Sequence, residues 1–540
     1  MRARRKLLSL PALLTAAFTV LAPAPAVART SVTPYVEAQQ VFSADLSGGN
    51  NDAATYTGIA AGVDATIDTS RLHGQIDYRY DHYFAWQKNR TDGDVHSGLA
   101  RLGYSVTPEL SLQVSGIATR TRGNGVSSSP GLLLGDFDNT DQVYGIQAGP
   151  SYAGHVGTFD INADYRFGWV KSGDGSGDID LGPNQPRLSN SFSTDSHTLD
   201  ASIGQRPGVL LPFGWTVSGG YVRDEIHFLD ARFTQKFGRL DVEQPITPAI
   251  ALLGGIGYEA DRASQAAVLT DAGGTAILDD HRHLRPDHSK PRVLSYDEDG
   301  LIWDVGVLWR PTSRTSLEVR GGQRYGQTVI TGSFTHKLTP TATVQVVAYD
   351  DISSFGRQLT GAIGALPTSF ASPIGLVPVS LQGCVFGANG GQGGCLNGLS
   401  STSTNFYRSR GVYGMVSSVR GLWTYALAVG YDHRRYFAPN DGTAASTLAG
   451  LTDDSVTADA IVSRRMSRLS TLTGSVYAAW YDSGLPATSN YATYGATIAY
   501  TREFSRHLTG QAALGVYSGS GGNADQDVIG SALIAIRYQL

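Results

Sequence analysis

Apolar and polar residues alternate strictly along many segments of the chain. Two clear examples are residues 72–81 and 158–167. In the first, Leu72, Gly74, Ile76, Tyr78 and Tyr80 alternate with His73, Gln75, Asp77, Arg79 and Asp81. Successive side chains of a β-strand point to opposite sides, so each segment predicts a strand with one apolar and one polar face.

The lengths of these segments favour a membrane barrel over a soluble sandwich. Many run for 11 to 14 residues, whereas a tilted strand needs about 9–11 residues to cross a bilayer and soluble strands usually have about 5–6. Tyr and Trp recur near the segment ends, and short turns marked by Pro or Arg alternate with long loops rich in Gly, Asn, Asp and Ser. Outer-membrane barrels show these features, with the short turns in the periplasm.

The segments predict an all-β, antiparallel transmembrane barrel of about 22 strands, within a range of 18–22. The hairpins near Glu225 and Gly326 are the least clearly marked, and the long loops 261–298 and 353–404 could fold into the lumen instead of outward. The last segment, 527–540, keeps its alternation to the terminus. It resembles the C-terminal signal read by the barrel-assembly machinery, although such signals usually end in Phe or Trp and this one ends in Leu540.

The N-terminal residues predict export. Four basic residues within positions 2–6 precede an apolar run, 7–21, and the small triplet Ala26-Val27-Ala28. This order is typical of a cleavable signal peptide, here residues 1–28, which leaves one barrel domain over 29–540. We expect a location in the outer membrane of a Gram-negative cell. The expected partners are the membrane's lipid and lipopolysaccharide and, during biogenesis, the barrel-assembly machinery.

Composition and charge narrow the class further. The chain has 65 Gly and 26 Tyr but only 3 Met and 2 Cys, which favours strands and tight turns. Without residues 1–28 it carries 38 basic and 47 acidic residues, a formal charge of about −9. This charge excludes a general nucleic-acid binder.

One hairpin carries a resemblance to a known family. It reads Trp303-Asp-Val-Gly-Val-Leu-Trp-Arg-Pro-Thr-Ser-Arg-Thr-Ser-Leu-Glu-Val-Arg320 and continues to His336. This stretch resembles the outer-membrane β-barrel family associated with exopolysaccharide and PEP-CTERM (exosortase) systems, and residues 144–150 and 254–259 add to the resemblance. The resemblance implies a part in surface polysaccharide or protein sorting, and it brings no catalytic residue.

Two cysteines, Cys384 and Cys395, lie in one Gly-rich loop. Because the chain is exported to an oxidising compartment, we expect a disulfide between them. A metal site is a poor interpretation, because two cysteines alone supply too few ligands.

Other constellations give no assignable site. The loop from Asp279 to His288 contains residue types that bind metals but is interpreted as a solvated loop. The stretch 296–300 could bind Ca²⁺ or cations that bridge lipopolysaccharide, yet it lacks the full spaced set of oxygen ligands, and no ligand is assigned in either place. The pairs Asp81-His82, Asp350-Asp351 and Asp432-His433 have the residue types with which barrel proteases activate water, yet such residues are common at polar rims. We expect no enzyme and no cofactor.

The polar faces predict a charged lumen. Opposed charges on a lumen wall either orient polar solutes or pair with one another and stiffen the wall. The leading interpretation is a non-enzymatic conduit or component for surface exopolysaccharide, with polysaccharide as a further partner. The alternatives are a porin-like channel for small solutes and a structural or adhesin barrel with a blocked lumen. The candidate lumen-lining residues are Asp77, Arg79, Asp160, Asp164, Arg166 and Arg320.

Overall fold

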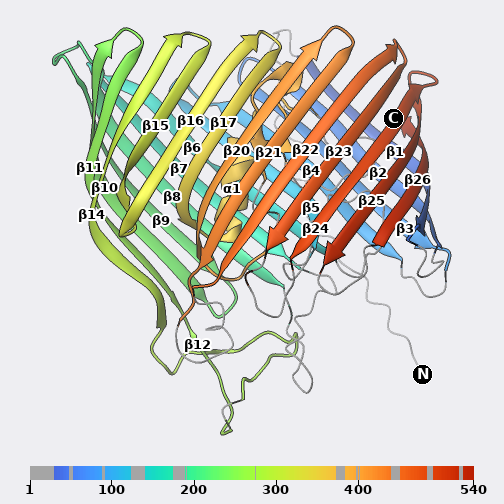
Figure 1. The fold of residues 1–540 in the computed structure, drawn as a ribbon, viewed down its shortest axis with the longest axis horizontal. Helices are drawn as coiled ribbons and strands as arrows, with labels where there is room; N and C mark the ends of the chain where they lie inside the picture. The colour runs from blue at the N-terminus through green and yellow to red at the C-terminus, as the bar shows by residue number, and fades with distance from the viewer. Residues whose placement is uncertain are drawn as a thin grey trace.

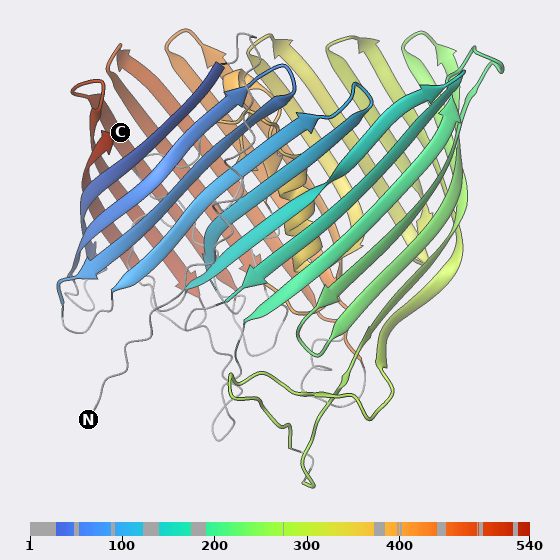
Figure 2. The same ribbon diagram turned by 180° about the vertical axis from the view of Figure 1, so that it is seen from behind.

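The computed structural model describes residues 29–47, 53–87, 92–122, 140–173, 189, 191–273, 275–371, 384–396, 399, 402–439, 450–482, 484, 490–521 and 527–540. The predicted signal peptide, 1–28, lies outside these residues. Over the described part, 22 long strands form one antiparallel sheet, which closes because the first strand pairs with the last, as in Tyr35 opposite Gln539. The predicted fold class and strand number are confirmed (Figures 1 and 2).

The strands of the barrel follow one another around the wall in chain order. They are β1 Arg29–Asp45, β2 Ala53–Asp68, β3 Leu72–Ala85, β4 Gly93–Ser105, β5 Leu110–Arg122, β6 Thr140–Val156, β7 Phe159–Ser172, β8 Phe192–Gln205, β9 Gly214–Ile226, β10 Ala231–Thr247, β11 Ile250–Gln265, β14 Val293–Thr312, β15 Thr315–Arg324, β16 Gln327–Thr339, β17 Ala342–Ser353, β20 Tyr407–Arg420, β21 Trp423–Tyr436, β22 Thr452–Ser467, β23 Ser470–Asp482, β24 Tyr491–Glu503, β25 Leu508–Gly521 and β26 Asp527–Gln539.

The remaining elements belong to two long connections. The first, between β11 and β14, contains β12 Ala267–Val268 and β13 Pro286–Asp287, which pair beyond the rim of the barrel. The second, between β17 and β20, contains helix α1 Phe355–Ala365, β18 Cys384–Val385, the 3-10 turn η1 Ala388–Gly390 and β19 Gly394–Cys395. Figures 1 and 2 show α1 inside the barrel, short turns at the upper rim and the β12–β13 connection below the lower rim. We call the upper rim the turn end and the lower rim the loop end.

The two weakly marked hairpins both exist. Tyr325 and Gly326 form the tight β15–β16 turn with φ of 56° and 64°. The β9–β10 turn lies four residues further along the chain than predicted, because Leu229 and Asp230 adopt the left-handed backbone conformation that reverses the chain. Strand β9 therefore includes Glu225, which pairs with Arg232.

The wall separates apolar from polar side chains, as the alternation predicts. On β14, Trp303, Val305 and Val307 are exposed on the outer face, while Asp304 lies on the inner face and pairs with Arg320. Apolar side chains are exposed on the outer face around the sheet, and a surface of this extent needs a lipid environment.

Between β4 and β5 the backbone ladder is completed by a side chain. Strands β4 and β5 pair only from Gly98 opposite Ala118 to the turn end. Beyond that point Gln142 of β6 donates from Nε2 to the carbonyl oxygens of His96 and Thr119, at 2.9 and 2.7 Å, and its Oε1 accepts from the His96 N–H at 3.2 Å. A backbone group without a partner is costly away from water, so this amide holds the wall together where the ladder ends.

Whether a strand residue points outward or inward decides which substitutions it tolerates. Val305 lies near the middle of its strand with 62% of its surface exposed on the outer face. We expect Val305→Arg to destabilise the barrel in a lipid bilayer by about 2–4 kcal/mol, because the guanidinium would enter hydrocarbon. Ser333 faces the lumen opposite Glu318, so Ser333→Arg, the matched control, should change stability by less than about 1 kcal/mol. Folding titrations into vesicles, followed by heat-modifiable gel migration, measure both, and equal effects would contradict this assignment of faces.

Candidate functional site

The described residues of the connection between β17 and β20 turn into the barrel instead of extending outside it. We call residues 354–406 the plug segment, described here at 354–371, 384–396, 399 and 402–406. Its first part forms α1 because Ser354 caps the helix, its Oγ accepting from the N–H of Arg357 at 3.1 Å, and because Pro367 follows the last turn. The prediction that the loop 353–404 could fold inward is confirmed. The companion loop 261–298 instead continues β11 and β14 and extends past the loop end.

An apolar face of α1 packs on an apolar stripe of the lumen wall. Phe355, Leu359 and Ile363 lie four residues apart, on one side of the helix, and are all buried. Phe355 meets the Phe192 ring edge-on, with ring centroids 5.8 Å apart. The wall residues in this cluster include Ile117 of β5, Val143 of β6, Val170 of β7, Phe192 of β8 and Phe233 of β10. Burying each large apolar side chain contributes about 1.5–3 kcal/mol, so the plug segment is held chiefly by this contact.

A buried ion pair fixes the start of the helix. Nε of Arg357 lies 2.8 Å from Oδ2 of Asp224 on β9, whose side chain is fully buried. Its Nη1 lies 3.2 Å from Asp351 on β17, and its Nη2 donates to the backbone carbonyl of Ile352. Oγ of Ser354 donates to the same Asp224 oxygen at 3.2 Å. One guanidinium thus ties α1 to two strands that lie far apart around the barrel.

Single hydrogen bonds attach the rest of the plug segment to the wall. Nε of Arg101 donates to the carbonyl of Leu366 at 3.1 Å, and the Phe370 N–H donates to Oε1 of Gln75 at 3.1 Å. Further along, Oγ1 of Thr121 donates to the carbonyl of Leu399 at 3.0 Å. These contacts are few and come from different strands.

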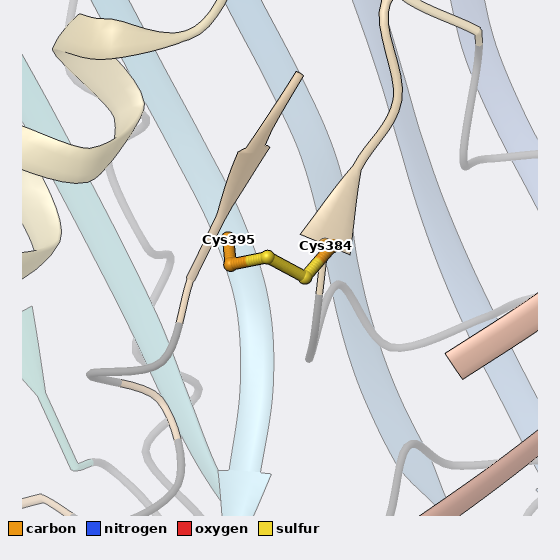
Figure 3. Close-up of a disulfide and its surroundings, with 2 residues drawn as sticks. All are labelled: Cys384 and Cys395. Carbon is orange, nitrogen blue, oxygen red and sulfur yellow. A yellow bond between two sulfur atoms is a disulfide. The ribbon is translucent and has the colours of Figure 1, made fainter. Parts of the chain in front are cut away.

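The two cysteines are joined in the second half of the plug segment (Figure 3). They face each other across β18 and β19, which pair in register. Phe386 and Cys395 belong to an apolar cluster with Met415 of β20 and with alanines of β21. This hairpin therefore rests on the β20–β21 wall, away from the wall that α1 covers.

A cavity of about 430 Å³ lies between the helix and the β17–β20 wall. The side of α1 that lines it is polar or small and includes Gln358, Thr360 and Gly361. The opposite boundary comes from β17 and β20, including Gln345 and Tyr413. Strands β6, β7 and β8, and Gly393 to Cys395 at β19, complete the lining.

The candidate lumen-lining residues all lie on inward faces, in separate groups. Arg79 is fully buried and pairs with Glu37 and Asp81 at 2.8 and 2.7 Å. Asp77 is buried and accepts from Gln75 at 3.1 Å. Removing Arg79 would take away the cation that pairs with buried Asp81 and one of the two cations that pair with Glu37, so a substitution there reports on stability and not on a passing solute.

The other four candidates also make ion pairs. Asp160 pairs with Arg206 near the turn end at 2.9 Å, and Asp164 pairs with Arg166 at 2.7 Å. Arg320 lies between Asp304 and Asp241, at 3.1 and 3.0 Å. Only Arg166 lines the cavity, so the predicted residues do not form one site.

The side chains of Asp81 and His82, and of Asp432 and His433, do not contact each other. Asp81 faces the lumen and His82 the outside, because adjacent strand residues point to opposite sides. His82 instead contacts Asp94 of β4 at 2.7 Å, and His433 contacts Asp454 of β22 at 2.9 Å. These outward contacts have no access to the lumen.

The loops with metal-binding residue types have structural roles. Asp279 accepts from the N–H groups of His281 and His283, both at 2.8 Å, which closes a turn. Burial raises the pKa of Asp279, but these N–H groups outweigh it and the pKa is lowered. The stretch 296–300 belongs to β14. Within the described residues no three His, Cys, Asp or Glu side chains gather as metal ligands, and no helix is long and apolar enough to span a membrane.

Sequence comparison with protein-family models and with curated proteins gives no match. The fold resembles solved barrels of siderophore and iron transport. The ferric-catecholate import receptor Fiu of E. coli K12 has 10% identity and a TM-score of 0.43, covering 94% of this chain and 81% of its own. The FrpB iron transporter of Neisseria meningitidis has 12% identity and a TM-score of 0.44, with 94% and 82% covered. The siderophore receptor PirA of Acinetobacter baumannii has 8% identity and a TM-score of 0.41, with 94% and 80% covered.

Each of these likenesses concerns the fold alone. Iron and siderophore transport are described for those proteins. None of the comparisons supports the exopolysaccharide association suggested by the hairpin from Trp303 to His336.

The Arg357 contacts predict how firmly α1 is held. Arg357→Ala would leave Asp224 buried without its cation, which costs about 3–5 kcal/mol. We expect this loss to appear as local opening, with amide hydrogen exchange of 355–365 at least about 100-fold faster. Arg223→Ala, on the same strand but in a partly exposed pair with Glu225, should leave that exchange unchanged. Slow exchange in Arg357→Ala would show that the ion pair does not hold the helix.

Proposed function

We propose that this protein is a non-enzymatic outer-membrane conduit whose lumen is closed at rest by the plug segment. The observation that carries the proposal is the way this segment is attached. The apolar face of α1 covers one side of the wall, and the disulfide hairpin rests on an apolar cluster of the β20–β21 wall. The polar attachments of the segment are one ion-pair centre at Arg357 and single hydrogen bonds. A polar cavity also lies beside α1, so the plug segment does not fill the lumen completely.

The wall supports a location in the outer membrane. Its exposed outer face is apolar and its strands are closed into one sheet, so no backbone edge meets lipid. In such barrels the short turns lie in the periplasm and the long connections outside the cell. The plug segment would then enter the lumen from the outer side, where it could respond to cargo or to a surface partner.

For cargo we propose a surface exopolysaccharide. The support is the resemblance of the Trp303–His336 hairpin to barrels of exopolysaccharide and PEP-CTERM systems, together with a lumen in which several arginines and carboxylates pair with one another. Hydroxyl groups exchange hydrogen bonds with such a wall at little net free energy, so a sugar chain can move without being trapped. A porin-like channel for small solutes is the second candidate, because a barrel of this strand number encloses an aqueous space once its plug moves.

Removing the plug segment tests the conduit. Ser353 and Tyr407 are paired neighbours on β17 and β20, so residues 354–406 can be replaced by the two-residue turn Asn-Gly without disturbing the wall. In planar bilayers we expect little conductance from the intact protein and large, steady conductance from this variant, because 16 strands or more enclose a water-filled channel.

The matched control shortens the other long connection. Replacing residues 269–285, beyond β12 and before β13, by Asn-Gly should leave the low conductance unchanged. A plug-deleted variant that folds, as judged by heat-modifiable migration, and still conducts no ions would overturn the conduit in favour of a structural barrel.

Deleting the gene tests the cargo. We expect less surface exopolysaccharide, or weaker retention of it, and unchanged uptake of small solutes. The wild-type gene should restore the phenotype, and quantitative sugar analysis of the cell surface measures it. Unchanged polysaccharide together with slower uptake of a small sugar would instead establish the porin-like channel.

A further inference from the structure

The cavity beside α1 is bounded by elements far apart in the sequence. Its lining contains many uncharged hydrogen-bonding side chains, from two parts of the wall, β6–β8 and β17–β20, and from the helix. Amides and hydroxyls can each donate and accept, which suits a ligand with many hydroxyl groups. The uncharged polar residues are Gln147, Ser196, Thr198, Gln345, Tyr349, Ser353, Gln358, Thr360, Ser409 and Tyr413.

The charged residues of the lining are already engaged with protein partners. Arg357 contacts Asp224 and Asp351, and Arg166 contacts Asp164 at 2.7 Å. Asp351 also accepts from the hydroxyl of Tyr325 at 2.8 Å. An anionic ligand would have to break one of these pairs to obtain a cation, whereas an uncharged ligand leaves them intact.

One polar atom of the lining residues has no partner. Oε1 of Gln345 on β17 is buried and accepts no hydrogen bond. A buried acceptor of this kind is unfavourable by about 1–3 kcal/mol. A rotation of the Gln345 side chain toward the cavity would let a ligand hydroxyl satisfy this oxygen. The aromatic ring of Tyr413, on the neighbouring strand β20, offers an apolar surface to the carbon face of a ring.

We propose that this cavity binds an uncharged saccharide, as a mono- or disaccharide or as a unit of a longer chain. Its volume of about 430 Å³ falls within the range of small-molecule sites. The proposal rests on the proposed conduit and deepens it by naming the ligand class and the place of contact. Because α1 forms one side of the cavity, a bound sugar would touch the plug segment itself.

Gly361 allows the cavity to be filled without harm to the fold. A Cβ added there meets no atom within 4 Å, and α1 gains helix propensity when a glycine is replaced. Gly361→Leu should therefore fold while occupying the ligand's space, and Gly361→Ala should have a smaller effect. Gly300 on β14, opposite Glu259, faces the lumen outside the cavity and also has open space. Gly300→Leu is the matched control.

The experiment is isothermal titration calorimetry of the full-length protein in detergent micelles with maltose, cellobiose and lactose, and with glucose 6-phosphate as an anionic comparison. We expect saturable binding of at least one neutral disaccharide and weaker binding of the phosphate. Gly361→Leu should weaken binding at least about tenfold, Gln345→Leu about three- to tenfold, and Gly300→Leu not at all.

Three outcomes would overturn the saccharide site: no binding of any neutral disaccharide, equal binding in Gly361→Leu, or tighter binding of glucose 6-phosphate. Conductance of the plug-deleted variant, measured in parallel, separates the two proposals. Conductance without sugar binding would reject this site and leave the conduit standing, whereas sugar binding without conductance would reject the conduit.

Discussion

Inward-facing apolar side chains on one side of a barrel this wide would meet water if nothing covered them. Val143, Val170 and Phe192 form such a stripe, and they are buried because Phe355, Leu359 and Ile363 of α1 lie on them. The strands fix the size of the lumen, so wall side chains alone do not fill it. The inward position of the plug segment, the cavity on its other side and the closed state all follow from this apolar contact.

Polar contacts then decide where the helix sits along the stripe. Burial of apolar area has little directional preference, whereas the contacts of Arg357 with Asp224 and Asp351 hold the helix start at one position between β9 and β17. Elsewhere in the lumen the arginines pair within the wall, as Arg320 does with Asp304 and Asp241. The wall is thus rigid, and Arg357 is the cation that links it to the start of α1.

The sequence predicts the wall well, because each strand crosses one boundary between lipid and lumen. The alternation around Tyr78 and Arg79 places the first outside and the second inside, as observed. The alternation in a single strand is a poor guide to its faces where the inward side chains are apolar. On β7 the inward face changes from Arg166 to Gly168 and Val170, and Val170 next to the outward Trp169 is the sequence signal that an apolar partner lies inside.

The plug segment and the cavity were harder to predict. The four-residue spacing of Phe355, Leu359 and Ile363 after Ser354 is a helix signal, but it is a short one inside a Gly-rich connection. The cavity could not be predicted at all, since Arg166, Gln345 and Gly361 come together only through barrel closure. Conversely, residues adjacent in sequence need not form a site, since Asp81 and His82 lie on opposite sides of the wall.

The central claim is that the plug segment occupies the lumen at rest, and a distance measurement in a bilayer tests it most directly. Nitroxide labels can be attached at Gly361→Cys on α1 and Gly300→Cys on β14, where both positions have open space, while the native cysteines are joined to each other. Pulsed electron–electron resonance on the reconstituted protein should give one narrow distance population, shorter than the barrel's width. A broad distribution that reaches beyond the barrel would show that the segment lies outside the lumen, and would contradict the account.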